Sequence, residues 1–407
     1  MEDNIAELKK EILELASVCN KCRFCLPSCP LFEITQHTNN GDIPTGVMEG
    51  EVSQGASGIL QSLHHIVRWD IHDKKTLTEL RDLLYSCTTC RNCELTCNKS
   101  STGVKLMDVF HKGRELLLEE EIAPMPNQRK PLESLFRYGN PYGMTPQERK
   151  EWMEGLEVPF FTRKGEFDYL FYVGCTAPHD TRVGEMARAI VALFKKAGVS
   201  FGILEEENCC GSPALRMGDR MLFEDIGQKN LSQFASLEPG RIITLSPHCS
   251  DTFANKYTWP EAPETKVQHY TQFMAELVEQ GKLSFKPGAA EDVVYQDPCY
   301  LGRHNDVYDA PRKVLTSIPG VKLHEFARSR ANSMCCGGGG GRMWSDFDAE
   351  EDRMANIRVK DGLKTGAMTL VTACPFCLIN LDDAVKSLDA EDSMRVKDLA
   401  SLAAEHI

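Results

Sequence analysis

Short apolar runs alternate with amphipathic stretches through the later part of the chain. Two halves repeat the same order of segments: a buried strand that ends in cysteine, an amphipathic helix, and a closing strand. These segments are DYLFYVGC (168–175), ARAIVALFKKAGV (187–199) and RIITLSPHC (241–249), then DVVYQDPC (292–299), PRKVLTSIPGV (311–321) and MTLVTACPFC (368–377). Strands alternating with helices predict parallel sheets with helices on their faces. We therefore expect two pseudo-symmetric α/β lobes, at residues 166–285 and 286–407.

The first part of the chain has a helical pattern instead. Leu77, Leu80, Leu83 and Leu84 fall on one stripe of a long helical stretch that begins near residue 63, and Thr76 is a candidate helix cap within it. Residues 1–125 are predicted to form an all-helical domain. Residues 126–165 are rich in proline and turn dipeptides, which predicts a connector with one short helix, Pro146 to Gly155.

Composition narrows the possible roles of the chain. With 407 residues it can hold about two to four domains. Its net charge of −13 argues against nucleic acid as a partner. The first residues lack the pattern of a signal peptide, and no apolar run has the roughly 18 residues of a transmembrane helix. We expect a cytoplasmic protein whose membrane contact, if any, is made through a partner.

The chain has 17 cysteines, an odd number that cannot pair completely into disulfides. Disulfides are also rare in a reducing cytoplasm, so bound metal is the simpler explanation. Eight of the cysteines form two C-x2-C-x2-C-x3-C motifs, Cys19, Cys22, Cys25 and Cys29, and Cys87, Cys90, Cys93 and Cys97.

This spacing is typical of two-cluster ferredoxins, in which the fourth cysteine of each motif binds the other cluster. One [4Fe–4S] cubane is thus expected on Cys19, Cys22, Cys25 and Cys97, and a second on Cys87, Cys90, Cys93 and Cys29. A pair of zinc sites is the alternative, although zinc usually takes two cysteine pairs that are well separated in sequence.

The other nine cysteines lie at strand ends or on nearby loops of the two lobes. The second lobe has Cys299, Cys335, Cys336, Cys374 and Cys377, and the first has Cys175, Cys209, Cys210 and Cys249. Ser246 stands where the repeat would place a counterpart of Cys374. Ligands bind at this edge of open α/β sheets, so we expect the thiols of each lobe to converge there.

The pair Cys335–Cys336 precedes five glycines. A disulfide between neighbours would be strained, and a flexible linker is the other simple reading of the glycines. The run GGGGGR follows cysteines and does not open a dinucleotide-binding loop, so no flavin or NAD is expected on this chain.

The duplicated C…CCG…CxxC pattern behind two ferredoxin motifs resembles the cysteine-rich CCG-domain family. The resemblance is carried by GNPYG (139–143), CCG (209–211), DPCYLGR (297–303), APR (310–312), CCGGGG (335–340) and CPFC (374–377). The family includes heterodisulfide reductase B- and D-type subunits. It also includes iron–sulfur subunits of glycolate oxidase, lactate-utilisation enzymes and anaerobic glycerol-3-phosphate dehydrogenase.

The resemblance implies a noncubane [4Fe–4S] cluster on the five thiolates of the second lobe. Backbone at Gly337, Gly338 and Gly339 would then approach the cluster and donate to sulfide. Arg303 would steady a bound anion or offset the negative charge of the cluster. Because the usual CPHC of the first lobe is SPHC here, that lobe would hold an incomplete noncubane cluster, an ordinary cluster or zinc. His248 could replace the missing ligand, but a solvent-facing histidine is the simpler expectation.

The function expected from this pattern is that of an iron–sulfur electron-transfer subunit in an anaerobic oxidoreductase with several subunits. A flavoprotein or another redox subunit is the expected partner, and a quinone is a further candidate. One alternative is a catalytic reductase of heterodisulfides or other disulfides, although the missing ligand at Ser246 counts against it. The other alternative is a zinc-rich scaffold or redox sensor.

Overall fold

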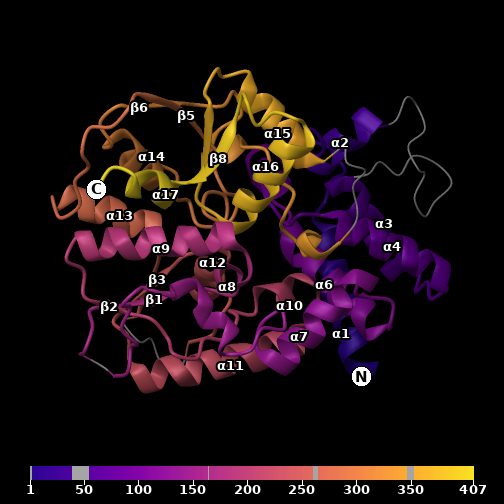
Figure 1. The fold of residues 1–407 in the computed structure, drawn as a ribbon. Helices are drawn as coiled ribbons and strands as arrows, with labels where there is room; N and C mark the ends of the chain where they lie inside the picture. Colours follow the sequence, from indigo (N-terminus) through magenta and orange to yellow (C-terminus); the bar gives the residue numbers. More distant parts are fainter. Residues whose placement is uncertain (1, 39–54, 164, 260–264, 346–352) are drawn as a thin grey trace. The chain divides into compact units, whose positions relative to one another are not determined.

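The computed structural model describes residues 2–38, 55–163, 165–259, 265–345 and 353–407 (Figure 1). The chain divides into two compact units. The first combines residues 1–132 with two later segments, 213–222 and 334–357. The second combines residues 133–212, 223–333 and 358–407. The domain boundaries expected from the sequence, at residues 125, 165 and 285, stay predictions.

Helices make up the regular structure that is described in residues 1–125, as the sequence predicts. They are α1 (Glu2–Ser17), α2 (Pro30–Thr38), α3 (Ala56–Arg68), α4 (Lys74–Ser86), α5 (Asn92–Ser100) and α6 (Leu106–Glu119). Helix α1 packs against α3 and α6, and α4 packs against the same two helices. Buried apolar side chains such as Ile12, Leu63, Leu80 and Phe110 fill the space between them.

The long helical stretch expected before the second cysteine motif is two helices. It breaks after Arg68, and α4 starts at Lys74. The cap of α4 is Asp73, whose carboxylate accepts from the backbone N–H of Thr76 at 2.9 Å. The expectation that Thr76 is a cap is therefore wrong. Asp73 precedes the first turn and can reach a free N–H, whereas Thr76 already lies inside the helix.

The connector holds more structure than its prolines suggest. It contains η1 (Pro126–Gln128), α7 (Arg129–Tyr138) and η2 (Glu148–Met153). The α-helix α7 was not expected from the sequence. Pro131 is compatible with it because it lies in the first turn, where backbone N–H groups have no helical acceptor. The short helix predicted at residues 146–155 is present as the 3₁₀-helix η2.

Two four-stranded parallel sheets confirm the duplicated α/β fold. Their strands are β1 (Tyr169–Tyr172), β2 (Phe201–Gly202), β3 (Arg241–Thr244) and β4 (Lys266–His269), then β5 (Glu291–Tyr295), β6 (Val321–His324), β7 (Thr369–Thr372) and β8 (Arg395–Asp398). Their orders are β2-β1-β3-β4 and β6-β5-β7-β8, the same topology twice. In register, Phe171 of β1 pairs with Ile243 of β3, and Val294 of β5 pairs with Leu370 of β7.

Helices connect and cover the strands. Those of the first lobe are α8 (Thr176–His179), α9 (Thr181–Lys196), α10 (Ser212–Arg216), α11 (Arg220–Leu237), α12 (Pro247–Asn255) and α13 (Tyr270–Glu279). Those of the second are α14 (Asp309–Thr316), η3 (Arg330–Asn332), η4 (Arg342–Trp344), α15 (Met354–Leu363), α16 (Pro375–Ser387) and α17 (Leu399–Ala404).

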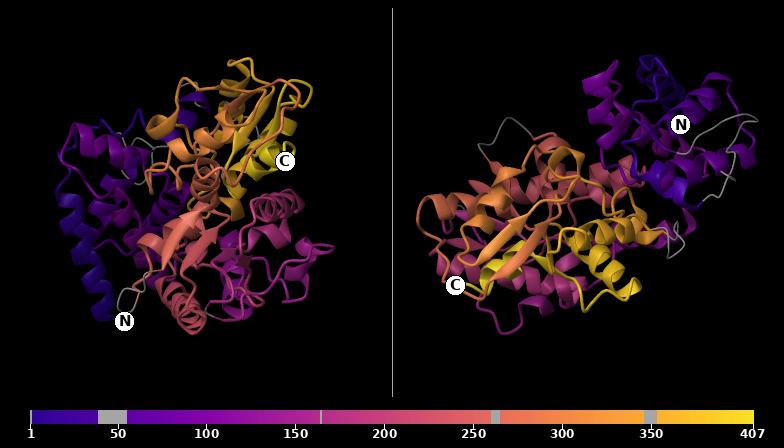
Figure 2. Two further views of the ribbon diagram at one scale, coloured as in Figure 1. Left: turned by 90° about the vertical axis from the view of Figure 1, so that its left-hand side faces the viewer. Right: turned by 90° about the horizontal axis from the view of Figure 1, so that it is seen from above.

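Within the second unit, the two sheets are joined through their helices. Helix α9 of the first lobe packs against α16 and α17 of the second, and α13 packs against α14 (Figure 1). Figure 2 shows the orange and yellow strands of the second sheet lying side by side from two further directions. In the part of the chain that the structure describes, no helix has the length and apolar character needed to cross a membrane.

Candidate functional site

The two ferredoxin-type motifs share one backbone conformation. In each motif, the residues before and after the second cysteine have a positive φ: 60° at Lys21 and 63° at Arg23, then 53° at Thr89 and 67° at Arg91. Such left-handed residues are uncommon outside glycine, so their repetition at matched positions marks a specific loop shape. Both motifs therefore wind their first three cysteines in the same way.

The cysteines of the first unit fall into two neighbourhoods. Burial raises the pKa of Cys29 to about 12, and repulsion from Cys87 and Cys90 adds to the shift. Burial also raises the pKa of Cys25 to about 12, with further repulsion from Cys29, Cys19 and Cys97. Each fourth cysteine is thus near thiols of the other motif, the arrangement that crossed ligation requires.

We call Cys19, Cys22, Cys25 and Cys97 the outer set, and Cys29, Cys87, Cys90 and Cys93 the inner set. Cys22 is exposed at the surface of the unit, whereas Cys90 and Cys93 are buried. The outer set therefore includes the most exposed of these eight thiols. The assignment of each set to one cubane stays a prediction.

In the first lobe, the four cysteines lie together within the second unit. The sulfur atoms of Cys175 and Cys209 are 3.7 Å apart. Hydrogen bonds with Cys209 and Cys249 lower the pKa of Cys210, against the effect of burial. The thiols thus form a continuous series. Cys175 follows β1, Cys209 and Cys210 lie on the segment after β2, and Cys249 lies in the first turn of α12.

Polar side chains hold the backbone of the vicinal pair in this lobe. The amide of Asn230 donates to the carbonyl of Cys209 at 2.9 Å, and the hydroxyl of Tyr257 donates to the carbonyl of Cys210 at 2.9 Å. The backbone N–H of Cys209 donates to the carbonyl of Gly139, in the GNPYG segment, at 2.6 Å. The adjacent cysteines are therefore fixed from both sides.

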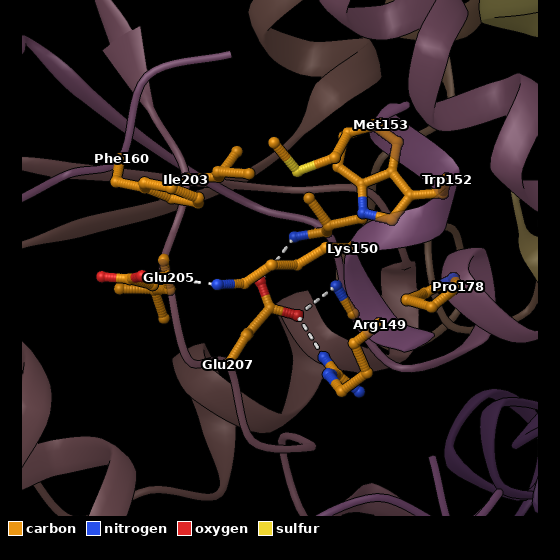
Figure 3. Close-up of a pocket in the computed structure, with 12 residues that line it drawn as sticks. Arg149, Lys150, Trp152, Met153, Phe160, Pro178, Ile203, Glu205 and Glu207 are labelled. Carbon is orange, nitrogen blue, oxygen red and sulfur yellow. Dashed lines mark hydrogen bonds and ion pairs between the residues drawn. The ribbon is translucent and has the colours of Figure 1, made fainter. Parts of the chain in front are cut away.

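Glu207 ties the loop of Cys175 to the loop of Cys209. Its buried carboxylate accepts from the backbone N–H groups of Val173 and Gly174, at 2.9 and 2.7 Å. Arg149 forms an ion pair with it at 3.3 Å (Figure 3). Burial raises the pKa of Glu207 to about 7, although Arg149 and the two N–H groups oppose the shift.

A small pocket opens beside this carboxylate, between Trp152, Phe160 and Glu205 (Figure 3). Its volume of about 30 Å³ has room for roughly two water molecules. The hydrogen bonds of Glu207 to Val173 and Gly174 give it a structural role in holding the cysteine loops.

Neither Ser246 nor His248 is placed to complete the ligand set of the first lobe. The Ser246 hydroxyl accepts from the backbone N–H of His248 at 3.3 Å and so caps α12. His248 is only 8% exposed, so the expectation of a solvent-facing histidine is wrong. Its ring packs against Tyr300 and Phe376 of the second lobe, at centroid distances of 4.0 and 4.9 Å. His248 lies in the first turn of α12, which faces the second lobe within the second unit.

His248 also contacts a cysteine of the other lobe. Burial opposes ionisation of Cys374, but hydrogen bonds from Cys377 and from His248 lower its pKa well below the usual value. Cys374 occupies the N-cap position of α16, and its side chain makes no capping hydrogen bond. Its sulfur is of the type that binds iron, unlike the capping oxygen of Ser246.

The other predicted ligands of the second lobe divide between the units. Cys299 follows β5 in the second unit, with Cys374 and Cys377, whereas Cys335 and Cys336 belong to the first unit. The convergence of all five thiols therefore stays a prediction. Arg303 is buried and donates to the carbonyls of Ala331 and Ser333, at 3.2 and 2.6 Å. It braces the segment that leads into the vicinal cysteines.

The glycine loop, residues 337–341, contacts the inner cysteine set within the first unit. The backbone N–H of Gly337 donates to the sulfur of Cys335 at 3.4 Å. At Gly340 (φ 65°), a Cβ atom would lie 2.2 Å from the carbonyl oxygen of Cys87. Sequence reasoning predicted close approach at Gly337, Gly338 and Gly339 and missed Gly340, because it looked only for contact with a cluster.

The donor sets fit iron–sulfur ligation. All 17 cysteines lie in described residues, and the nine in the two lobes are buried except for the partly exposed Cys175. Thiolates are the ligands of iron–sulfur clusters, and thiols as close as Cys175 and Cys209 could bind one compact centre. Among the described residues, no group of three or more His, Cys, Asp or Glu side chains is arranged so that it could hold a single metal ion.

Models of two protein families match three parts of the chain. The 4Fe-4S dicluster domain family matches residues 15–101, and the Cysteine-rich domain family, CCG, matches residues 169–254 and 293–382. The crystal structure of a hypothetical protein from Helicobacter pylori has a similar fold, with a TM-score of 0.56 at 12% identity, over 92% of this chain and 70% of that one.

Curated relatives are redox proteins. The chain is 37% identical to the probable iron-sulfur-binding oxidoreductase FadF of Bacillus subtilis, over 80% of this chain and 46% of the relative. It is 32% identical to the EtfAB:quinone oxidoreductase of Syntrophomonas wolfei, over 97% of this chain and 58% of the relative. The chain thus spans about half the length of these two relatives.

A third relative is matched over nearly its whole length. The D-type subunit of the dihydromethanophenazine:CoB–CoM heterodisulfide reductase of Methanosarcina mazei is 30% identical over 97% of this chain and 94% of that relative. The two ferredoxin-type motifs share one conformation, and the two sheets that follow them in sequence share one topology. The chain belongs to the family of iron–sulfur oxidoreductases that join a 4Fe-4S dicluster domain to two cysteine-rich CCG domains.

Proposed function

We propose that this chain is an electron-transfer subunit that relays electrons between a flavoprotein partner and the CCG cysteines of the second lobe. Two cubanes on the outer and inner sets and a noncubane cluster on Cys299, Cys335, Cys336, Cys374 and Cys377 would supply one-electron chemistry. The first lobe, with four thiols, would hold a further iron–sulfur centre or zinc. We expect the chain to work in the reducing cytoplasm, with any membrane contact made through a partner.

One observation carries this proposal: Cys87 lies close to Cys335. Repulsion from Cys335 is among the causes, after burial, that raise the pKa of Cys87 to about 11. Cys87 also neighbours Cys29 and Cys90 of the inner set. The thiols of the first unit therefore form a series from Cys25 through Cys29 and Cys87 to Cys335, and electron transfer by tunnelling needs such neighbouring centres.

The partner is proposed from the relatives. One is named for a reaction between EtfAB and quinone, and another is part of a heterodisulfide reductase. This chain carries no dinucleotide fingerprint, so hydride chemistry would belong to a flavoprotein such as an electron-transfer flavoprotein. The exposed outer set is the natural place for that protein to deliver electrons.

Reduction of a disulfide by the chain itself is the second candidate, favoured by the match to the heterodisulfide reductase relative over almost its full length. The capping role of Ser246 counts against two equivalent clusters, because its oxygen is already used by α12. Anaerobic protein given reduced viologen and a disulfide would separate the two functions. Turnover without any partner supports the reductase, and its absence together with rapid reduction by a reduced flavoprotein supports the relay.

The ligand assignment is tested by Cys336→Ser, with Cys210→Ser as the matched change in the other lobe. Cys336→Ser should erase the noncubane signal in electron paramagnetic resonance and leave both cubane signals intact. Cys210→Ser should leave the noncubane signal unchanged. Wild-type protein that is pale, with little iron or acid-labile sulfide, would refute the proposed function altogether.

A further inference from the structure

Arg114 is a charged side chain buried completely inside the first unit. It lies in α6, and its guanidinium is 4.7 Å from the ring centre of Tyr85. A buried guanidinium loses its hydration and needs acceptors around it. Four backbone carbonyls accept from it: Leu84 at 2.7 Å, Cys87 at 2.8 Å, Arg216 at 2.5 Å and Gly340 at 2.9 Å.

These carbonyls come from three stretches of chain that are far apart in sequence. One stretch leads into the second ferredoxin-type motif. The other two follow the CCG motifs of the two repeats and belong to the later segments of the first unit, 213–222 and 334–357. Arg114 therefore binds the inner cysteine set and both CCG repeats through one side chain.

The two later segments dock in matched ways. Each repeat has an Arg-Met pair after its CCG motif, at residues 216–217 and 342–343. Arg216 contacts His111 of α6 at 3.1 Å, and Arg342 donates to the carbonyl of Ser86 at 2.8 Å. The duplicated sequence thus supplies two anchors to the same unit, and Arg114 holds the backbone of both.

The later segments approach Cys87 and Arg114 most closely at two glycines. A Cβ at Gly340 would lie 2.2 Å from the Cys87 carbonyl oxygen, and a Cβ at Gly218 would lie 2.7 Å from the carbonyl carbon of Arg114. Both glycines have a positive φ, 65° and 90°. The contact between the glycine loop and Cys87 is therefore specified by backbone shape as well as by hydrogen bonds.

The charge of Arg114 acts on Cys87 directly. Its guanidinium donates to the Cys87 carbonyl at 2.8 Å, so a buried positive charge lies next to this residue of the inner set. A cation that favours a thiolate also favours any further negative charge placed at the same position. An added electron is such a charge, so the guanidinium is placed to ease reduction at the inner set.

We propose that Arg114 is a positioning residue that couples the inner cysteine set to the CCG loop of the second repeat. It fixes the glycine loop against Cys87, and its charge raises the reduction potential of the centre on the inner set. The second part rests on the proposed electron-relay function, and the first does not.

The ordering role is tested by hydrogen–deuterium exchange of full-length protein as purified. Lysine keeps the charge but concentrates its donors at one point, so Arg114→Lys cannot reach carbonyls of three stretches. Protection of residues 339–342 should fall by about tenfold or more, since charged hydrogen bonds are lost. Arg358→Lys is the control, because Arg358 is equally buried but lies in the second unit. Unchanged protection in Arg114→Lys would overturn the ordering role.

The electrostatic role is tested by redox titration followed by electron paramagnetic resonance. In Arg114→Gln, the midpoint potential of one cubane should shift to a more negative value and the other should stay constant. Arg114→Lys should keep most of the wild-type potential. Equal potentials in all three proteins would overturn the electrostatic role. If Arg114→Gln does not fold, a potential in Arg114→Lys equal to that of Arg358→Lys supports the role of charge, and a large negative shift overturns it.

These outcomes separate the inference from the proposed function. Wild-type protein without cubane signals refutes the relay, whatever the exchange data show. Cubane signals that are present but insensitive to Arg114 leave the relay standing and refute the coupling by charge.

Discussion

Ser246 and Cys374 occupy the same position in the two lobes, the N-cap of the helix after the third strand, yet only Ser246 caps its helix through its side chain. The serine oxygen accepts from the backbone of α12, while Cys374 keeps a thiol at the start of α16. Because Ser246 has an oxygen where Cys374 has a sulfur, the first lobe has four thiols and the second has five.

Ser246→Cys should convert the first lobe to a five-thiol set. The loss of the cap costs about 1 kcal/mol of stability, and iron bound per chain should rise. Iron and acid-labile sulfide in anaerobic protein measure the gain, with Ser246→Ala as the control that loses the cap without adding a thiol. Equal iron in the two variants would show that the serine is not what limits the first lobe.

His248→Phe should alter the centre on the second lobe. It replaces the imidazole by the ring that Phe376 provides at the matched position, and so removes the hydrogen bond to Cys374. Hydrogen bonds to thiolate sulfur raise reduction potential, so a negative shift of the noncubane signal is expected. His179→Phe, at a histidine stacked on Tyr142 in the same unit, is the control. The same titration curve in both variants would contradict the prediction.

Gly340→Ala and Gly366→Ala form a matched pair for the glycine loop. Both positions have a positive φ, 65° and 78°, so each alanine is strained by about 1–2 kcal/mol. A Cβ at Gly366 meets open space, but one at Gly340 collides with the Cys87 carbonyl. Thermal unfolding should therefore show a much larger loss of stability for Gly340→Ala. Equal losses would mean that the loop does not contact Cys87.

Asp398 makes stability depend on pH. Burial raises its pKa to about 7, although it accepts from the Tyr270 hydroxyl at 2.9 Å and the Ala400 N–H at 2.7 Å. An unfolded aspartate titrates near 4, so the native state binds the proton more tightly between about pH 4 and pH 7. Stability from this group is then fully present below about pH 4 and falls as pH rises to about 7.

Asp398→Asn keeps an acceptor oxygen and removes this titration. Relative to wild type, it should gain stability as the pH rises from about 5 to about 8, by up to about 3 kcal/mol. Anaerobic unfolding midpoints at the two pH values measure the difference. Midpoints that change in parallel would show that Asp398 does not hold its proton in the native state.

Much of the fold follows from local patterns. DYLFYVGC and DVVYQDPC place Cys175 and Cys299 at strand ends because each apolar run is too short for a helix and is followed by turn residues. The repeat of these segments predicts one topology twice, which the two strand orders confirm. The α-helix at 129–138 was missed because the prolines and glycines around it outweighed its own residues.

The inward position of His248 and the burial of Arg114 depend on contacts distant in sequence. LMDVFHKGRELLLE predicts an amphipathic helix on which an arginine would normally face solvent, and nothing local shows that carbonyls near residues 84, 216 and 340 gather around it. A single signal was available: Arg-Met follows the CCG motif in both repeats. It becomes informative only once both segments are seen in the first unit.

The discontinuity of the first unit limits how this module can be exchanged between proteins. A gene fragment ending at residue 132 would omit the stretches that supply Arg216 and Gly340, and would leave a buried cation with two of its four acceptors. Recombination that transfers residues 1–132 alone would therefore give a domain in which Arg114 lacks two of its acceptors. We expect natural recombination to transfer the domain with the eight ferredoxin-type cysteines together with both CCG repeats.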